Sequence, residues 1–124
     1  MNNRIAILSD IHGDTTALKA VIADARALGA TEYWLLGDIL LPGPGREDLF
    51  ELLDAIPITA AVRGNWDDCV LEALDGEYGL EDPQEIQLLR LTQYLMEGLD
   101  PKRIDWLRSL PLVEKKEVNG IRFH

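Results

Sequence analysis

Residues 5–14 read Ile-Ala-Ile-Leu-Ser-Asp-Ile-His-Gly-Asp, and the rest of the chain is organised around this stretch. The apolar run over residues 4–9 has the length and the Ile/Leu content of a β-strand buried on both faces. It ends in Asp10 and His12, two polar residues separated by one position. In an α/β sheet, ligand-binding and catalytic residues lie beyond the carboxyl ends of the strands. One carboxylate and one imidazole at such a place suit a divalent transition metal.

A similar polar ending follows two further predicted strands. An Asp-x-His pair alone is also typical of an ordinary strand end, and Asp14 suits the N-cap of the next helix. However, Gly37-Asp38 follows the predicted strand 32–36, and Gly64-Asn65 follows the predicted strand 58–62. Neighbouring strands lie about 4.8 Å apart, so we expect four polar side chains to converge at one sheet edge: Asp10, His12, Asp38 and Asn65. Such a set can hold Mn²⁺, Fe or Zn²⁺, and a carboxylate between two metals can bridge them.

Hydrophobic periodicity places helices between and after the strands. We predict helices over residues 14–28, 46–56, 66–74, 83–98 and 101–109, and a hairpin of residues 112–118 and 121–124. The buried stripes of the first two helices are expected to be Leu18, Val21, Ile22, Ala25 and Leu28, and Leu49, Leu52, Leu53 and Ile56. This order predicts an α/β fold with a parallel βαβαβ sheet and a metal site at the carboxyl ends of its strands. We expect one domain over residues 1–124, with a helical cap-like insertion over residues 75–110.

The composition narrows the class of protein. The chain has 124 residues, 47% of them hydrophobic, which suits one domain with a core. Its net charge of −10 argues against non-specific binding to nucleic acid or to an anionic membrane. If the protein handles phosphate, bound cations would offset the repulsion. Cys69 is the only cysteine, which fits the reducing cytoplasm, and neither a signal peptide nor a membrane-spanning run is predicted.

The ordered motifs Asp10-x-His12, Gly37-Asp38 and Gly64-Asn65-x-Asp67 resemble those of the calcineurin-like metallophosphoesterases, most closely their small bacterial phosphoesterase branch. The resemblance covers roughly the first half of the chain. It implies the family's four-layer α/β/β/α sandwich, of which the parallel sheet would be a part. It also implies hydrolysis of phosphodiesters or phosphomonoesters by water that two divalent metals activate. Mn²⁺ is the expected metal, with Fe, Zn²⁺ or Ni²⁺ as alternatives.

The resemblance also implies roles for single residues. Asp10 and His12 would hold the first metal, Asp38 would bridge both metals, and Asn65 would hold the second. The implied catalytic residues are Asp38, Asn65 and Asp67. Asp67 would orient the metal site through hydrogen bonds, or would simply serve the first turn of the next helix.

Two residues beside the third motif are candidate substrate contacts. Arg63 would contact a phosphate oxygen, or would be a solvated arginine at a strand end. Trp66 stands where many family members carry a His that is assigned to leaving-group protonation or transition-state stabilisation. Its indole would stack on an aromatic or nucleobase part of a substrate, or would be buried at a helix start. A general acid contributes about 10²–10⁴-fold to a rate, so its loss points away from esters with poor leaving groups.

The chain departs further from the family pattern in its second half. Its only histidines are His12 and His124, and it has no Gly-His-x-His motif; we do not take His124 as a ligand. The chain therefore resembles the N-terminal half of a longer phosphoesterase, with an incomplete metal site and an exposed sheet edge that invites a homo-oligomer. The alternative to an enzyme is a catalytically inactive binding or scaffold protein that keeps the fold. A nucleotide-binding Rossmann-like domain is disfavoured, because no Gly-x-Gly-x-x-Gly follows the first strand.

Overall fold

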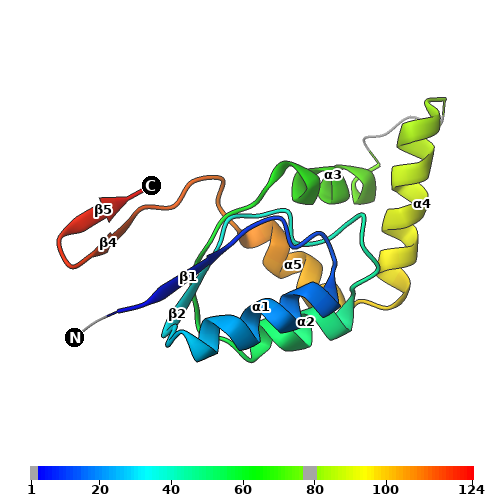
Figure 1. The fold of residues 1–124 in the computed structure, drawn as a ribbon. Helices are drawn as coiled ribbons and strands as arrows, with labels where there is room; N and C mark the ends of the chain where they lie inside the picture. The colour runs from blue at the N-terminus through cyan, green and yellow to red at the C-terminus, as the bar shows by residue number, and fades with distance from the viewer. Residues whose placement is uncertain (1–2, 77–80) are drawn as a thin grey trace.

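Three short parallel strands form the centre of the fold. The computed structural model describes residues 3–76 and 81–124 (Figure 1). Its strands β1 (Ile5–Leu8), β2 (Glu32–Leu35) and β3 (Ile58–Ala61) pair in parallel in the order β1-β2-β3. Helices α1 (Thr15–Ala27) and α2 (Glu47–Asp54) connect them. The predicted α/β class and parallel βαβαβ sheet are thereby confirmed.

Three helices and a hairpin follow the sheet along the chain. They are α3 (Asn65–Leu74), α4 (Pro83–Glu97), α5 (Pro101–Ser109) and the antiparallel strands β4 (Lys116–Val118) and β5 (Ile121–Phe123). The hairpin turns at Asn119-Gly120 as predicted, with φ of 51° and 81°. Part of the cap-like insertion predicted over residues 75–110 lies outside the described residues, at 77–80. Every described helix is too short or too polar to cross a membrane.

One face of the sheet packs on helices through a single hydrophobic cluster. All five helices contribute to it, together with the sheet: Leu18, Ile22, Leu35, Leu49, Phe50, Val70, Leu95, Ile104 and Leu107. Burial of one such side chain contributes about 1.5–3 kcal/mol. Asp14 caps α1 as predicted, because its carboxylate accepts from the Ala17 amide at 2.9 Å. The single domain over residues 1–124 and the cap-like insertion over residues 75–110 stay predictions.

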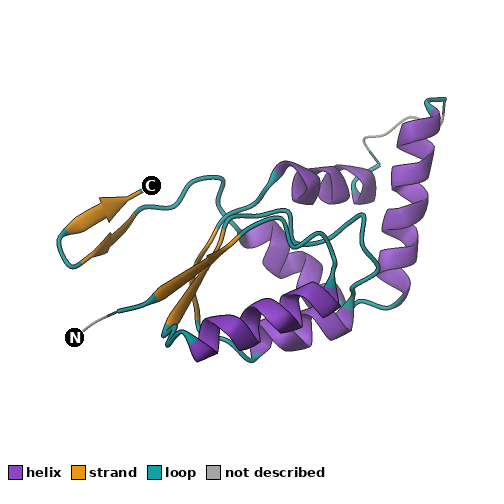
Figure 2. Cartoon of the chain, in the orientation of Figure 1, coloured by secondary structure: helices purple, strands orange, loops and turns teal. Residues whose placement is uncertain are grey.

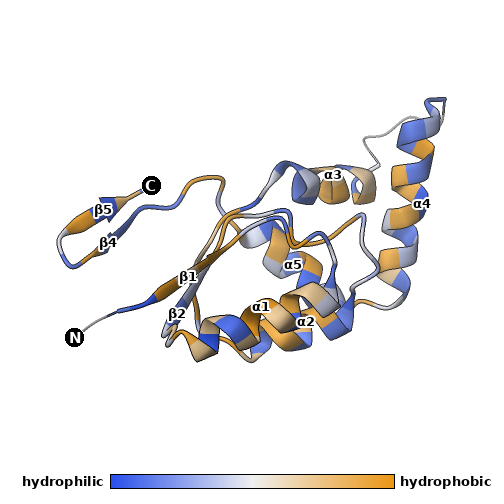
Figure 3. Ribbon diagram, in the orientation of Figure 1, coloured by the Kyte–Doolittle hydropathy of each residue, from blue (hydrophilic) through white to orange (hydrophobic). Residues whose placement is uncertain are grey.

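The other face of the sheet is largely uncovered, so the prediction that the first strand is buried on both faces is wrong. We call this surface the open face and define it by Ile7, Trp34, Leu36 and Val62, which line a hollow of about 200 Å³ beside the hairpin. Ile7 is 53% exposed and Leu36 is 50% exposed, because no described helix lies over them. The hairpin stands apart from the helices (Figure 2), and its Phe123 ring packs against Trp34 at a ring-centroid distance of 5.3 Å; Trp34 is 6% exposed. Figure 3 colours most of β1 as hydrophobic, which agrees with an apolar surface left open.

Several predicted boundaries and buried positions also need correction. In α1, Val21 is 43% exposed and Leu28 is 61% exposed. Val21 lies over the groove beside β1, and Leu28 is at the helix end, so neither reaches the core. In α2, Phe50 is fully packed in the core although it was not among the predicted buried positions, whereas Leu52 is only partly buried. The first hairpin strand begins at residue 116, four residues later than predicted.

The two edges of the sheet differ. At β3, the Ala61 amide donates to the Glu114 carboxylate at 3.0 Å, and the Arg63 amide donates to the Pro111 carbonyl at 2.9 Å. These contacts occupy edge donors that another strand would otherwise pair with. At the opposite edge, β1 borders a groove of about 640 Å³ whose apolar lining includes Ile7 and Val21. A groove of about 590 Å³ also borders β3, so the outer amides of β3 that are already hydrogen-bonded distinguish this edge, and not the size of its groove.

Candidate metal centre

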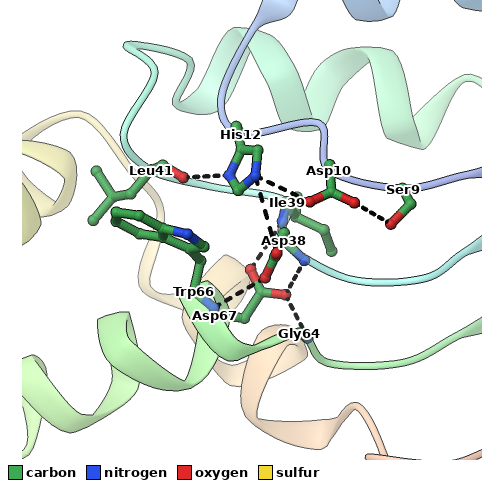
Figure 4. A network of polar contacts seen from close by, with 9 residues as sticks. All are labelled: Ser9, Asp10, His12, Asp38, Ile39, Leu41, Gly64, Trp66 and Asp67. Atoms are coloured by element: carbon green, nitrogen blue, oxygen red, sulfur yellow. Dashed lines mark hydrogen bonds and ion pairs between the residues drawn. The ribbon is translucent and has the colours of Figure 1, made fainter.

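Three predicted ligands meet beyond the carboxyl ends of β1 and β2. Asp10, His12 and Asp38 each offer one ligand atom, and these atoms all lie within 4.8 Å of one another (Figure 4). The His12 Nε2 atom is 3.2 Å from Asp10 Oδ1 and 3.9 Å from Asp38 Oδ2. The exposed fraction of the side chain is 62% for Asp10, 30% for His12 and 14% for Asp38, so the cluster opens to solvent on the side of Asp10.

The backbone at all three ligands is left-handed. The φ angles are 56° at Asp10, 50° at His12 and 55° at Asp38. A non-glycine residue in this region costs about 1–3 kcal/mol and persists only where the surroundings enforce it. Here the Asp10 amide donates to the Gly37 carbonyl at 3.1 Å, and the His12 amide donates to the Asp38 carbonyl at 2.8 Å. The two ligand loops therefore hold each other in this conformation.

The imidazole of His12 is oriented by a backbone carbonyl. Its Nδ1 lies 2.9 Å from the carbonyl oxygen of Leu41, which can only accept, so Nδ1 carries the proton. In the neutral ring this leaves the lone pair of Nε2 directed at Asp10 and Asp38, the arrangement found at metal-binding histidines. Burial lowers the pKa of His12, but the Leu41 carbonyl and the two carboxylates outweigh it, so the net shift is upward.

Each carboxylate has one oxygen engaged and one facing the cluster. Asp10 Oδ2 accepts from the Ser9 hydroxyl at 2.6 Å, and this bond is the main reason that the pKa of Asp10 is lowered. Asp38 Oδ1 accepts from the backbone amide of Trp66 at 2.9 Å, at the start of α3. The remaining oxygens, Asp10 Oδ1 and Asp38 Oδ2, face His12.

Asn65 lies against Asp38, as the sequence predicts for the third strand end. With its amide nitrogen toward Asp38, Asn65 donates to Oδ1 at 3.3 Å and to Oδ2 at 3.2 Å. Rotation of the same planar group by half a turn directs its carbonyl oxygen there, as a metal ligand would require. The carboxamide is exposed and is therefore free to take either orientation.

Asp67 lies beneath the cluster and does not reach it. Its side chain is fully buried, and it accepts from the backbone amides of Asp38 at 2.8 Å, Ile39 at 2.9 Å and Gly64 at 3.0 Å. Burial raises the pKa of Asp67, and the hydrogen bonds from these amides oppose the rise. The carboxylate thus joins the loop after β2 to the loop after β3.

The two candidate substrate residues have protein partners. Arg63 forms an ion pair with Asp68 and donates to the carbonyl oxygens of Arg108 at 3.2 Å and Leu110 at 3.1 Å. The Trp66 ring is partly buried and meets the His12 ring edge-on, with centroids 5.9 Å apart and planes at 83°. The roles of Arg63 and Trp66 in contacting substrate stay predictions.

The loop over residues 42–45 supports the first motif, a role that the sequence did not reveal. The Gly43 amide donates to the His12 carbonyl at 2.8 Å, and the Gly45 amide donates to the Gly13 carbonyl at 2.7 Å. A Cβ atom on Gly43 would lie 2.1 Å from the His12 oxygen, so the approach requires glycine. These glycines bring the loop onto the backbone of His12. The role of Leu41 could not be predicted from sequence either, because it contacts His12 through its backbone carbonyl, which any residue at this position would provide.

The donor set fits a divalent transition metal. Two carboxylate oxygens and an imidazole nitrogen, with an amide oxygen beside them, are ligands for Mn²⁺, Fe or Zn²⁺. The hydrogen bonds from Ser9, Leu41 and the Trp66 amide orient these ligands from behind, as outer-shell partners do at metal sites. Among the described residues, this is the cluster of His, Cys, Asp and Glu with metal-binding spacing.

Comparisons with known proteins agree with the fold and show the family. The family model described as calcineurin-like phosphoesterase matches residues 3–124. The chain is 31% identical to the uncharacterized protein MJ0912 of Methanocaldococcus jannaschii, over 97% of this chain and 47% of that protein. It is also similar to the crystal structure of a metallophosphoesterase from Sphaerobacter thermophilus, with a TM-score of 0.65 and 30% identity over 95% of this chain and 44% of that one. The chain thus spans about half the length of these relatives, and it belongs to the calcineurin-like phosphoesterase family.

Proposed function

We propose that this protein hydrolyses phosphodiesters or phosphomonoesters with two divalent metal ions, Mn²⁺ in preference to Fe, Zn²⁺ or Ni²⁺. The observation that carries the proposal is the convergence of Asp10, His12 and Asp38, whose ligand atoms lie within 4.8 Å of one another. Family membership supports the reaction class. Because the chain spans about half of its relatives, we propose that the complete centre includes ligands from a longer chain or from a second copy.

We assign a metal-binding role to each of four residues of this chain. Asp10 and His12 would hold one ion, Asp38 would reach both, and Asn65 would hold the second through its carbonyl oxygen. Bound metal ions would supply Lewis acidity and would activate water for attack on phosphorus. Leu41 keeps the proton of His12 on Nδ1 and so keeps Nε2 available.

Charge explains why metal is needed for substrate binding. The chain carries a net charge of −10, and the cluster contains two carboxylates. A phosphate ester approaching these groups is repelled unless cations neutralise them. The metal ions would therefore bind the substrate as well as activate the water.

A second candidate function is that of a catalytically inactive binding protein that keeps the fold. The position of Trp66 favours it, because an indole ring lies perpendicular to the His12 ring where the family commonly has a proton-donating imidazole. An indole cannot protonate a leaving group at neutral pH. An active enzyme with Trp66 should accordingly prefer esters with good leaving groups, such as aryl phosphates.

The experiment that tests the proposal measures metal content per chain after loading with Mn²⁺ and desalting. The parent is compared with Asp38→Asn and with Asp24→Asn, which changes an exposed carboxylate on α1. We expect bound metal in the parent and in Asp24→Asn and a loss in Asp38→Asn. Hydrolysis of p-nitrophenyl phosphate and bis(p-nitrophenyl) phosphate is then measured on the loaded protein. Bound metal without hydrolysis favours the binding protein, and no bound metal in the parent contradicts the proposal for this chain.

We also propose a cytoplasmic location and self-association through the edge of β1. A single cysteine, Cys69, fits a reducing compartment. The edge of β1 and the neighbouring open face are apolar surfaces that a second copy of this chain would cover. The net charge of −10 is unfavourable for non-specific nucleic-acid binding.

A further inference from the structure

The Asp67 carboxylate is fully buried, yet it lies directly behind the metal centre (Figure 4). A buried carboxylate is costly unless hydrogen bonds satisfy its oxygens. Its Oδ2 accepts from the amides of Asp38 and Gly64, and its Oδ1 accepts from the amide of Ile39. Both oxygens are therefore used, and all of these partners are backbone groups of the loops that carry the second and third motifs.

These amides depend on Asp67 for a partner. Gly37 and Asp38 have positive φ angles of 98° and 55°, so the chain has left strand geometry here, and the Asp38 amide donates to Asp67 and not to a neighbouring strand. Gly64 packs so closely against this loop that a Cβ atom on it would lie 2.2 Å from Asp38 Oδ1. The carboxylate of Asp67 lies between the two loops and accepts from amides of both.

Asp38 is in consequence held at two points. Asp67 holds its backbone amide at 2.8 Å, and the Trp66 amide holds its Oδ1 at 2.9 Å. Both holding groups come from the first turn of α3, one residue apart. With backbone and side chain fixed from the same turn, Asp38 Oδ2 is left facing His12.

We infer that Asp67 is a positioning residue that sets the direction of the Asp38 carboxylate and thereby the affinity of the centre for metal. This inference rests on the proposed function. Asp67 acts through Asp38 and touches neither metal nor substrate. The carboxylate matters, because an amide of the same shape offers one acceptor and turns its NH₂ group toward backbone donors. Loss of such an outer-shell partner typically weakens metal binding by about 10–100-fold.

The test compares Asp67→Asn with Thr92→Val in the whole 124-residue chain. Thr92 is also fully buried, and its hydroxyl donates to the Leu88 carbonyl at 2.8 Å within α4, so its loss removes a buried hydrogen bond away from the centre. Mn²⁺ affinity is measured by calorimetry at a temperature where circular dichroism shows each protein folded. We expect Asp67→Asn to bind Mn²⁺ about 10–100-fold more weakly and Thr92→Val to bind within twofold of the parent, even where the two variants lose similar thermal stability.

The outcomes separate the inference from the proposed function. If the parent binds no metal, both fall. If the parent binds Mn²⁺ and Asp67→Asn binds it within twofold, the proposed function stands and the positioning role is wrong. If Asp67→Asn and Thr92→Val weaken binding equally, the effect is one of general stability, and the positioning role is again wrong.

A measurement on the parent covers the case in which Asp67→Asn does not fold. Hydrogen exchange at the amides of Asp38, Ile39 and Gly64 is followed by NMR with and without Zn²⁺, which is diamagnetic. If Asp67 ties these amides to the centre, Zn²⁺ slows their exchange more than that of the Leu35 amide in β2. Equal slowing at all four amides would overturn the inference.

Discussion

We call the end of the sheet that carries Asp10, His12 and Asp38 the metal edge. It lies within a few residues of the open face along β1 and β2, yet the two regions are built differently. At the metal edge, the backbone of each ligand is hydrogen-bonded to another loop, and so are the side chains of His12 and Asp38, whereas the Asp10 side chain is held by its neighbour Ser9. On the open face, Ile7 and Leu36 are about half exposed, and the hairpin covers the sheet through one aromatic contact. The comparison shows that hydrogen bonds between the loops of this chain maintain the geometry of the ligands, whereas few contacts cover the apolar side chains of the open face.

We expect the largest effect from Gly64→Ala, which adds one methyl group beside the ligand Asp38. In Gly64→Ala the new Cβ atom would lie 2.2 Å from Asp38 Oδ1 and 2.6 Å from the Asp38 amide nitrogen. Overpacking of this kind costs about 1–3 kcal/mol, and Asp38 has to move. We expect a lower free energy of unfolding in urea and loss of Mn²⁺ binding.

Gly76→Ala is the matched control. Gly76 has a φ of 75°, but no heavy atom of the described residues lies within 4 Å of the added Cβ, so backbone strain is the expected cost. We expect about 1 kcal/mol of destabilisation with Mn²⁺ affinity unchanged. Normal metal binding by Gly64→Ala would show that the edge is looser than the close packing of these loops indicates.

A smaller effect is expected where the hairpin meets the open face. Phe123→Ala removes the edge-on contact with Trp34, and an aromatic pair of this kind contributes about 0.5–1.5 kcal/mol beyond area burial. We expect a modest loss of unfolding free energy, a change in tryptophan fluorescence, and unchanged Mn²⁺ affinity. Ile121→Ala, at an exposed hairpin position, serves as control. Loss of metal binding in Phe123→Ala would mean that the two regions are coupled.

Asp54→Asn probes an exposed ion pair that lies in neither region. The carboxylate of Asp54 binds Arg103 through both oxygens, at 2.9 and 2.7 Å, and the hydrogen bond from Arg103 lowers the pKa of Asp54 below its ordinary 3.8. The pair therefore stabilises the fold above about pH 3.8, and this contribution is lost as the pH falls through the lowered folded-state pKa.

Because the pair is exposed, the cost of Asp54→Asn at pH 7 should be below about 1 kcal/mol. Urea denaturation of the parent and variant at pH 7 and pH 3 measures the difference, with Glu51→Gln as control on the exposed side of α2. We expect the difference to shrink in acid. A difference that grows in acid would give the pKa shift the opposite sign.

The smallest change in stability is expected on the open face itself. Ile7→Thr keeps a β-branched side chain at a position that is 53% exposed, so the free energy of unfolding should change by less than about 0.5 kcal/mol. If a second copy covers this surface, sedimentation velocity should show concentration-dependent association that Ile7→Thr weakens. Leu28→Thr, at the far end of α1, should leave the association unchanged. A parent that stays monomeric at every concentration contradicts this role for the surface.

The meeting of the ligands followed from sequence because it depends on topology. Apolar runs that end in Asp10, Asp38 and Asn65, with helices between them, give parallel strands whose carboxyl ends share an edge. The N-cap at Asp14 and the turn at Asn119-Gly120 followed from local preferences that residues close in sequence satisfy.

What could not be predicted depends on partners that a residue's letter does not name. The pattern of Ile7 is the same whether or not a layer covers its face, so its exposure could not be read from β1. For Asp67 the sequence left two roles open, one in the first turn of a helix and one in orienting the metal site, and the two loops that its buried carboxylate contacts appear only in three dimensions. Leu41 acts through its carbonyl, which every residue possesses.

The left-handed backbone at Asp10, His12 and Asp38 limits how this centre can be transplanted. Regular strands and helices place residues at negative φ, so the same three side chains grafted onto an ideal scaffold would diverge. To build this centre into another protein, a designer would have to transfer the whole turns, together with the loop over residues 42–45 and the buried carboxylate of Asp67 that hold them. The smallest transferable unit of this site is therefore the set of hydrogen-bonded turns, and not the ligand side chains alone.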